Sequence, residues 1–520
     1  MHWLCDRTGP LRVNKCWVLV LGGIIGLSAC AVGPEYQTPD TEVPDAFKPP
    51  LVKVAHKSDQ ESAMDRAEWW RALHDPELDS LIDRAISSNL DLEIALTRLQ
   101  TARTQELVVI GQALPAGGAT GGGGIGTGTN ASVGRAMEPL RSAQNLTNLS
   151  KLTETGGFEA TWEIDVFGKY WRALQEATYN AEALADARDW VLITVAADVA
   201  RAYLDMRALQ GELAVLRKNI SVARTSLEFA KTRFERGITN ELDVALAERF
   251  LGTLQASVAP FEAQIEASRN VIATLLGQFP EELAKELAAP GKLPAFPAEI
   301  APGLPIELLR RRPDIHEAER QLAAATAHIG VATADLFPQV ILTGAVGGQG
   351  GPAKGTAIPI TFIGSAGPSV YWPMLDFGTL DAIVNIAEYD AHALLVNYKQ
   401  TIITAVQQVD DSVAFYRAAQ QRLRDLNRAL VAARRATKIA NDRYDRGLTD
   451  YLNVLDAERQ EYDLEQQYVS TQGTAAEEFV ALYKALGGGW ESHQMIPPIK
   501  QPQPALIAEI KRSLAPDEVR

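Results

Sequence analysis

The sequence predicts an α+β membrane protein built from two tandem copies of one unit, in which pairs of β-strands alternate with very long helical hairpins. Three observations predict this fold class. They are an N-terminal export signal, an internal repeat that covers most of the chain, and two long stretches without proline. Together they indicate an elongated exported protein that works as an oligomer.

The composition excludes several classes of protein. The formal net charge is −15, from 50 basic and 65 acidic residues, and the longest run of Lys or Arg is the three arginines Arg310–Arg312, so no nucleic-acid partner is expected. The three cysteines are Cys5, Cys16 and Cys30, so no disulfide or cysteine metal site is expected after Cys30. No nucleophile–base pattern or metal-ligand spacing is found either. We therefore expect neither an enzyme nor a resident cofactor.

The N-terminus has the pattern of an export signal. Two basic residues precede the apolar run Cys16–Leu27, and small residues then precede Cys30, which predicts a signal peptide over residues 1–29. The run is shorter than the roughly 20 residues that a membrane-spanning helix needs. The ending Leu27–Cys30 resembles a bacterial lipobox, which implies that Cys30 carries S-diacylglycerol and N-palmitoyl chains. Ala31 then resembles an outer-membrane sorting residue. A plain signal peptide that happens to end in cysteine is the alternative.

An internal repeat organises the rest of the chain. With a shift of 210 residues, Thr232–Arg249 aligns without gaps with Asp442–Arg459, and nine of the eighteen positions are identical. The same shift aligns Trp162 with Trp372, and upstream of the strands the shift becomes 223. Similarity between two Ala-rich helices would not keep such landmarks in register, so a duplication is predicted.

The repeat defines the expected domains. Residues 30–70 are proline-rich and predict an extended, lipid-anchored segment, and residues 491–520 predict an irregular tail. The first repeat is expected over 71–290 and the second over 303–490. Each reads as a helix, two strands, a long helix, a turn and a second helix.

The long helices are predicted by composition. Phe167–Arg236 and Phe377–Arg446 contain no proline and are rich in Ala, Leu, Arg and Glu. Seventy helical residues would extend about 100 Å, twice the width of a compact domain. A glycine follows each stretch, as at helix C-termini, and polar residues after it are expected to cap the returning helix. These are Gly237 with Thr239 or Asn240, and Gly447 with Thr449 or Asp450.

The strands are predicted between Pro115 and Trp162 and between Pro338 and Trp372, where Gly, Thr, Ser and Val are frequent and apolar residues alternate. Loops are expected around 132–152 and 347–356. Two strands of about ten residues per copy suit a transmembrane β-barrel. Four strands cannot close a barrel, whereas three chains would supply twelve. A soluble β-hairpin domain is the alternative.

Other motifs have structural interpretations. The glycine run Gly121–Gly128 precedes no helix and lacks the lysine of a phosphate-binding loop, so it predicts a strand or loop. Arg310–Asp314 predicts the start of a helix, with Asp314 near its positive end. Trp69 and Trp70 are expected to serve packing.

Two features together resemble a known family. The segment Cys30–Tyr36 (CAVGPEY) and the tandem hairpins with Arg-Gly tips are similar to the outer-membrane factors of RND-type tripartite efflux systems, the NodT-like lipoprotein branch of the TolC family. The resemblance covers essentially the whole mature chain. It implies a homotrimer in which a twelve-stranded outer-membrane β-barrel continues into a periplasmic α-helical barrel. It also implies passive export of drugs or other small toxic compounds, together with a periplasmic adaptor protein and an inner-membrane RND-type transporter.

The resemblance also implies site residues. Both tips would contact the adaptor, through Arg236, Gly237, Ile238, Thr239, Arg446, Gly447, Leu448 and Thr449. A periplasmic gate would involve Leu452, Asp456 and Arg459, which share one face of a helix, and Asp243 in the first copy. The first copy has Leu246 where the second has Asp456, so a charged ring is expected from the second hairpin. The alternative for these residues is a solvated helix face.

Two other functions remain open from the sequence. One is an outer-membrane conduit for secreted proteins or peptides, and the other is a trimeric surface stalk that transports nothing. The second predicts exposed helices without an interior passage.

Overall fold

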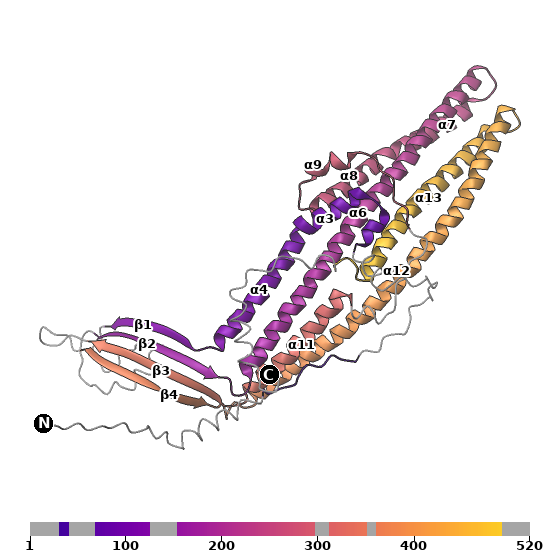
Figure 1. Ribbon diagram of the computed structural model, residues 1–520. Helices are drawn as coiled ribbons and strands as arrows, with labels where there is room; N and C mark the ends of the chain where they lie inside the picture. Colours follow the sequence, from indigo (N-terminus) through magenta and orange to yellow (C-terminus); the bar gives the residue numbers. More distant parts are fainter. Residues whose placement is uncertain (1–30, 41–67, 125–152, 297–310, 351–359, 491–520) are drawn as a thin grey trace, which may run out of the picture.

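The computed structural model has a long, narrow shape, with the β-strands at one end and two helical tips at the other (Figure 1). The expected signal peptide, Cys30 and the expected C-terminal tail lie outside the residues that the structure describes. Those residues are 31–40, 68–124, 153–296, 311–350 and 360–490.

The predicted order of elements is found in both halves of the chain. The first half contains η1 (Trp69–Leu73), α3 (Pro76–Ser88), α4 (Leu90–Gln112), β1 (Ala116–Gly124), β2 (Thr153–Ile164), α6 (Lys169–Glu235), α7 (Glu241–Ala256), α8 (Val258–Leu275), α9 (Pro280–Leu283) and η3 (Glu286–Ala288). The second half contains α11 (Pro313–Ala334), β3 (Gln339–Gly350), β4 (Ile360–Tyr371), α12 (Thr379–Asp445) and α13 (Tyr451–Ala485).

The two long helices, α6 and α12, have 67 residues each. They begin and end within two residues of the predicted limits, because glycine marks both boundaries of each helix and proline is absent between them. At a rise of 1.5 Å per residue, each helix is about 100 Å long. The distance between the sheet and the tips is therefore set by two uninterrupted helices.

The returning helices differ between the two halves. In the first half the helix is interrupted at Ser257, between α7 and α8, whereas α13 runs without a break. Pro260 has no N–H to donate to the Ala256 carbonyl, which accounts for the break. The equivalent position in α13 is Ser470, which keeps that donor.

The four strands form one antiparallel sheet in the order β1-β2-β3-β4, so β1 and β4 are its open edges. Strand β3 continues to Gly350, which corrects the predicted loop over 347–356 at its start. Its last residues pair with β2, for example Gly347 with Gly157. A glycine-rich segment was interpreted as a loop, but backbone pairing does not require side chains.

The register separates the sheet into an apolar face and a polar face, because directly opposite residues point to the same side. Bulky residues of the apolar face, all from β2, β3 and β4, are Phe158, Trp162, Ile164, Val340, Leu342, Val346, Phe362 and Val370. The polar face carries Thr155, Glu159, Thr161, Glu163, Gln339, Thr343, Ser365 and Ser369, together with Ile341, Ile363 and Tyr371. Most of the apolar set is exposed in the single chain.

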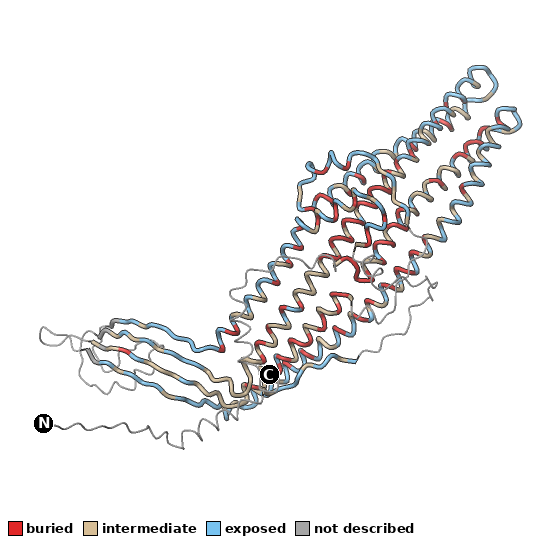
Figure 2. The backbone as a smooth tube through the Cα atoms, in the orientation of Figure 1, coloured by how far each residue is buried: buried red, intermediate tan, exposed pale blue. Residues whose placement is uncertain are grey.

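The helices pack side by side in a single layer. Helix α6 packs against α4, α7 and α8 on one side and against α11 and α13 on the other, whereas α12 has its main helix contacts with α11 and α13 alone. Burial is densest midway along the helices (Figure 2). There Trp69 and Trp70 pack with Phe479, which confirms the expected packing role of the two tryptophans. None of the described helices is both long and apolar enough to cross a membrane.

Candidate functional site

The first tip is a tight reversal built around a glycine. Gly237 has φ +68°, a conformation that costs other residues about 1 kcal/mol or more. Its N–H donates to the Phe234 carbonyl at 2.8 Å, and the N–H of Ile238 donates to the Arg233 carbonyl at 2.9 Å. This pair of bonds is the Schellman arrangement that ends a helix and satisfies its last carbonyls.

The second tip repeats this geometry. Gly447 has φ +70°, its N–H donates to Tyr444 at 2.9 Å, and the N–H of Leu448 donates to Arg443 at 2.9 Å. The duplication has therefore preserved the backbone of the tip as well as its sequence.

Both tips present apolar side chains to solvent. Ile238 is 59% exposed and its equivalent Leu448 is 62% exposed. Four residues further on, Leu242 and Leu452 are exposed to the same extent. We call Ile238/Leu242 and Leu448/Leu452 the tip pairs. Four large apolar side chains gathered at the two ends of the helices are a surface suited to a protein partner.

Polar side chains form hydrogen bonds at the start of the helix that leaves each tip, and in the first tip they cap it. The Asn240 side chain accepts from the N–H of Asp243 at 3.2 Å, and the Thr239 hydroxyl donates to the Asp243 carboxylate. In the second tip the Asn453 amide donates to the Thr449 hydroxyl at 2.9 Å, but the N-cap residue Asp450 makes no capping hydrogen bond through its side chain, which corrects the expected cap there. Asp243 therefore lies on α7 and is engaged in hydrogen bonds at its own tip.

Those other residues share one exposed face of α13. Leu452, Asp456 and Arg459 are all exposed, and Asp456 accepts a hydrogen bond from Gln460 at 2.8 Å. Arg459 forms no ion pair with any residue that the structure describes.

An arginine–aromatic contact joins the two hairpins near their tips, which the sequence did not indicate. The Arg233 guanidinium lies 4.5 Å from the Tyr444 ring centroid and 5.6 Å from that of Phe229. It also donates to the Tyr444 carbonyl at 3.3 Å. Such a contact adds cation–π attraction to hydrophobic burial. An aromatic residue at both repeat-equivalent positions, Phe234 and Tyr444, was the signal available.

A buried carboxylate with two half-exposed cationic partners forms a second link between the hairpins. Glu465 on α13 accepts from Lys218 of α6 at 2.9 Å and from Arg434 of α12 at 2.8 Å. Burial opposes ionisation of Glu465, but the bonds from Lys218, Asn219 and Arg434 outweigh it and hold its pKa below the ordinary value. At Glu458 burial prevails and raises the pKa.

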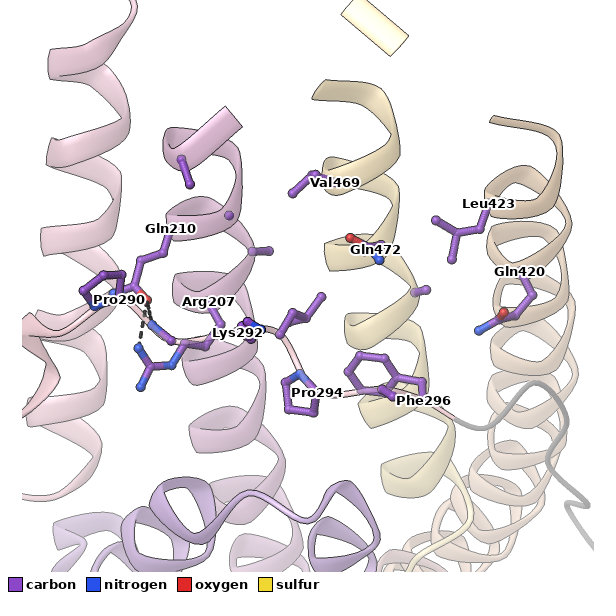
Figure 3. A pocket seen from close by; sticks show the side chains of 17 residues that line it. Arg207, Gln210, Pro290, Lys292, Pro294, Phe296, Gln420, Leu423, Val469 and Gln472 are labelled. Carbon is purple, nitrogen blue, oxygen red and sulfur yellow. Dashed lines mark hydrogen bonds between the residues drawn. The ribbon is translucent and has the colours of Figure 1, made fainter. Parts of the chain in front are cut away.

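A cavity of about 480 Å³ lies where both repeats meet the segment that joins them (Figure 3). Helices α6, α12 and α13 line it together with residues 290–296. Arg207 beside it forms an ion pair with Glu77 and donates to the Ala289 carbonyl at 2.9 Å. These bonds fasten the inter-repeat segment to α6 and α3, which is a structural role.

Asp186, on α6 near α11, is expected to make the folding stability depend on pH in a testable way. Burial raises its pKa to about 6, against the opposing effect of His316. Because the raised pKa belongs to the folded state, stability is lost as the pH rises from about 4 to about 6 and is constant above that. We expect Asp186→Asn to match the wild type near pH 4 and to be more stable at pH 7.5, by about 1 kcal/mol after allowance for solvent screening. Thermal melting of the purified protein over this range tests it, with the exposed Asp83→Asn as control. A difference that is independent of pH would contradict the assignment.

The chain matches known proteins over most of its length. The family described as "Outer membrane efflux protein" matches residues 81–278 and 304–488. Nodulation protein T of Rhizobium leguminosarum bv. trifolii is 30% identical over 83% of this chain and 89% of that protein. The toluene efflux pump outer membrane protein TtgC of Pseudomonas putida is 30% identical over 89% of this chain and 93% of that protein.

Solved structures agree with this result. The outer-membrane channel OprN has a TM-score of 0.76 and 34% identity, and covers 89% of this chain and 100% of its own. The open state of the Neisseria gonorrhoeae MtrE outer membrane channel has a TM-score of 0.72 and 27% identity, with coverage of 89% and 99%. The chain therefore belongs to the outer membrane efflux protein family, as a TolC-like efflux channel of the outer membrane whose helices lie in the periplasm.

Proposed function

We propose that three copies of this chain enclose one continuous duct, which passively conducts drugs and other small toxic compounds out of the cell. A periplasmic adaptor and an inner-membrane RND-type transporter would deliver them and supply the energy. The observation that carries the proposal is that the sheet has one apolar face and two open edges. The layer of helices that continues from it also has two edges without a neighbouring helix in the same chain. Neither layer can close within one chain.

The sheet supports the membrane part of this proposal. Its exposed apolar face suits lipid, and its polar face, with Glu159 and Glu163, suits a water-filled interior. The open edges β1 and β4 expose unpaired backbone groups, which are costly in a bilayer unless another chain pairs with them. Three sheets would give a closed barrel of twelve strands.

The repeat predicts how neighbouring subunits touch. Within one chain, Phe167 at the start of α6 stacks on Phe337 beyond α11, with ring centroids 4.7 Å apart. The repeat-equivalent residues are Phe377, which is 98% exposed, and Leu114, which is 41% exposed. If rotation about the duct relates successive repeats, Phe377 packs on Leu114 of the next subunit.

The tips fit the same rotation. Arg233 stacks on Tyr444 within the chain, and the equivalent residues are Arg443 and the exposed Phe234. Arg443 would then stack on Phe234 of the next subunit. Six hairpin ends would thus be linked by alternating contacts within and between chains.

The gate follows from this arrangement. Three copies of Leu452 would form an apolar constriction, three of Asp456 a charged ring, and Arg459 would pair across chains. Asp243 would lie nearby on the first hairpin but remain bound to Thr239. The tip residues Arg236–Thr239 and Arg446–Thr449 would contact the adaptor.

Cys30 would carry the lipid anchor, with S-diacylglycerol and N-palmitoyl chains. More than one acyl chain is needed for stable attachment to a membrane, and the lipobox resemblance supplies both. The names of the toluene efflux protein TtgC and of the antibiotic efflux protein ArpC of Pseudomonas putida support drugs and other small toxic compounds as the cargo.

Cross-linking tests the subunit arrangement. Cysteines at Leu114 and Phe377, joined by a short thiol-specific reagent, are expected to give products of two and three chain masses and none larger. The matched pair Phe167→Cys and Phe337→Cys should react within one chain and leave its mass unchanged. If the control pair reacts while the first pair gives no product between chains, or gives a ladder beyond three, the proposed trimer is wrong.

A further inference from the structure

The residues that follow Cys30 lie in a groove between α6 and α11. We call residues 31–40 the strap and this groove the strap groove. The N–H of Val32 donates to the Phe167 carbonyl at 3.1 Å, three residues beyond the end of β2. Ala31 lies against Gly168, where an added Cβ would be 2.7 Å from the Ala31 Cα. The strap thus begins at the base of the sheet.

A buried arginine binds the backbone of the strap. Arg172 is 2% exposed, and it donates to the Val32 carbonyl at 3.1 Å and to the Gly33 carbonyl at 3.2 Å. Hydrogen bonds from a charged donor in a buried setting are among the stronger ones in proteins. Arg172 therefore binds the strap backbone where it bends at Gly33.

Two glycines allow the strap to cross α11 in direct contact. Gly33 has φ +88°, and a Cβ added to it would lie 2.4 Å from the Cα of Gly330. A Cβ on Gly330 would lie 2.7 Å from the Arg172 side chain. A side chain at either glycine would prevent the strap from lying against α11 at this point.

A buried carboxylate binds the second part of the strap. Glu319 of α11 is 8% exposed, and it accepts from the Tyr36 hydroxyl at 3.1 Å and from the Thr38 hydroxyl at 3.2 Å. The Tyr36 ring also lies 6.1 Å from that of Tyr179. Glu319 keeps a charged partner in Arg320 at 3.3 Å. The groove thus supplies a donor for strap carbonyls and an acceptor for strap hydroxyls.

The duplication shows that this groove is not a general feature of the fold. At the repeat-equivalent positions Arg172 is replaced by Ala382, Gly330 by Leu107 and Glu319 by Leu96. The junction between α12 and the next subunit therefore lacks the donor, the acceptor and the space. The groove exists once per chain, where the strap is.

We propose that the strap groove is a dedicated binding site for the lipid-bearing N-terminus, which fixes the anchor beside the base of the sheet. This inference rests on the proposed attachment of lipid to Cys30. Cys30 is one peptide unit from Ala31, so its acyl chains would start within about 4 Å of the strap's end. If the segment from Cys30 to η1 were a free flexible chain, the typical distance between its two ends would be roughly 35 Å, and the lipid could move that far from the channel. When the strap is bound in its groove, the lipid is held at one position relative to the channel. The bound strap also contacts both repeats, through α6 and α11.

Hydrogen exchange of the full-length trimer tests the proposal. Gly33→Ala adds one methyl group to the strap, outside the helical core, so the channel should still fold. We expect the strap amides, Val32 above all, to exchange at least tenfold faster than in the wild type. Gly330→Leu should act in the same way from the groove. The matched controls are Gln37→Ala, on the exposed side of the strap, and Gly111→Leu, where an added Cβ meets nothing within 4 Å.

The outcomes separate the two proposals. Unchanged exchange in both Gly33→Ala and Gly330→Leu would overturn the strap site, as would equal acceleration in the two controls. Intact mass of the purified wild type reports the lipid independently. A chain without the acyl mass but with a protected strap would overturn the lipid anchor, and hence its fixation, while leaving the groove contacts in place.

Discussion

Replacing Ile238 and Leu448 by aspartate is expected to abolish capture of the adaptor while the channel still folds. Both side chains are exposed on glycine turns that end the two long helices, so they stabilise neither hairpin. Burying an apolar side chain of this size contributes about 1.5–3 kcal/mol to an interface. A charge at both tips should therefore weaken adaptor binding by at least about 100-fold. Binding of the purified adaptor and complementation of a channel-deficient strain measure it.

A control must show that the tips, and not charge alone, are responsible. Asp442→Ser changes an exposed residue one turn before the second tip and should leave binding and complementation unchanged. The double variant should also keep its trimeric mass and melting temperature. Full adaptor affinity in the double variant would show that the tips are not the docking surface.

Removing Asp456 and Arg459 together by alanine substitution is expected to open the channel. The two residues lie on one exposed face of α13, and the described part of the chain gives Arg459 no ionic partner. Pairing between subunits would hold the helix ends together at rest, and its loss should raise the open probability severalfold. Single-channel recording in planar bilayers measures this quantity directly.

The repeat supplies the control for the gate. Arg249 is the equivalent of Arg459 on the first hairpin, but Leu246 stands where the second hairpin has Asp456. Arg249→Ala should therefore leave the open probability unchanged. Equal effects of the two hairpins would mean that the closure does not depend on the Asp456–Arg459 arrangement.

Local chemistry explains why the helical hairpins were predictable. Glycine and proline act on their own backbone, so the absence of proline over some seventy residues, and the glycines at Gly168, Gly237, Gly378 and Gly447, define the helices without tertiary information. Pro260 accounts for the break at Ser257 by the same local rule, although no break was expected there. The sheet was less certain at its ends, because Gly347–Gly350 pair through backbone alone.

Contacts between distant residues could not be predicted from the sequence. Arg172 and Val32 are 140 positions apart, and Tyr36 and Glu319 are 283 apart. The spacing of apolar and polar residues along the sequence gives no information about which distant residues form such pairs. The same holds for Arg233 on Tyr444, which joins the two hairpins, and for Glu465 between Lys218 and Arg434. For the site itself, sequence reasoning located the tips and the exposed face of α13, but not the hydrogen bond from Thr239 to Asp243.

Release of solutes from proteoliposomes tests most directly whether the chain encloses a passage. Liposomes that hold a small charged dye and a large dextran are reconstituted with the wild type or with the Asp456→Ala/Arg459→Ala variant. The proposed channel predicts that the variant releases the dye rapidly, that the wild type releases it slowly, and that both retain the dextran. Retention of the dye by correctly assembled trimers of both proteins would contradict a duct and leave a solid stalk.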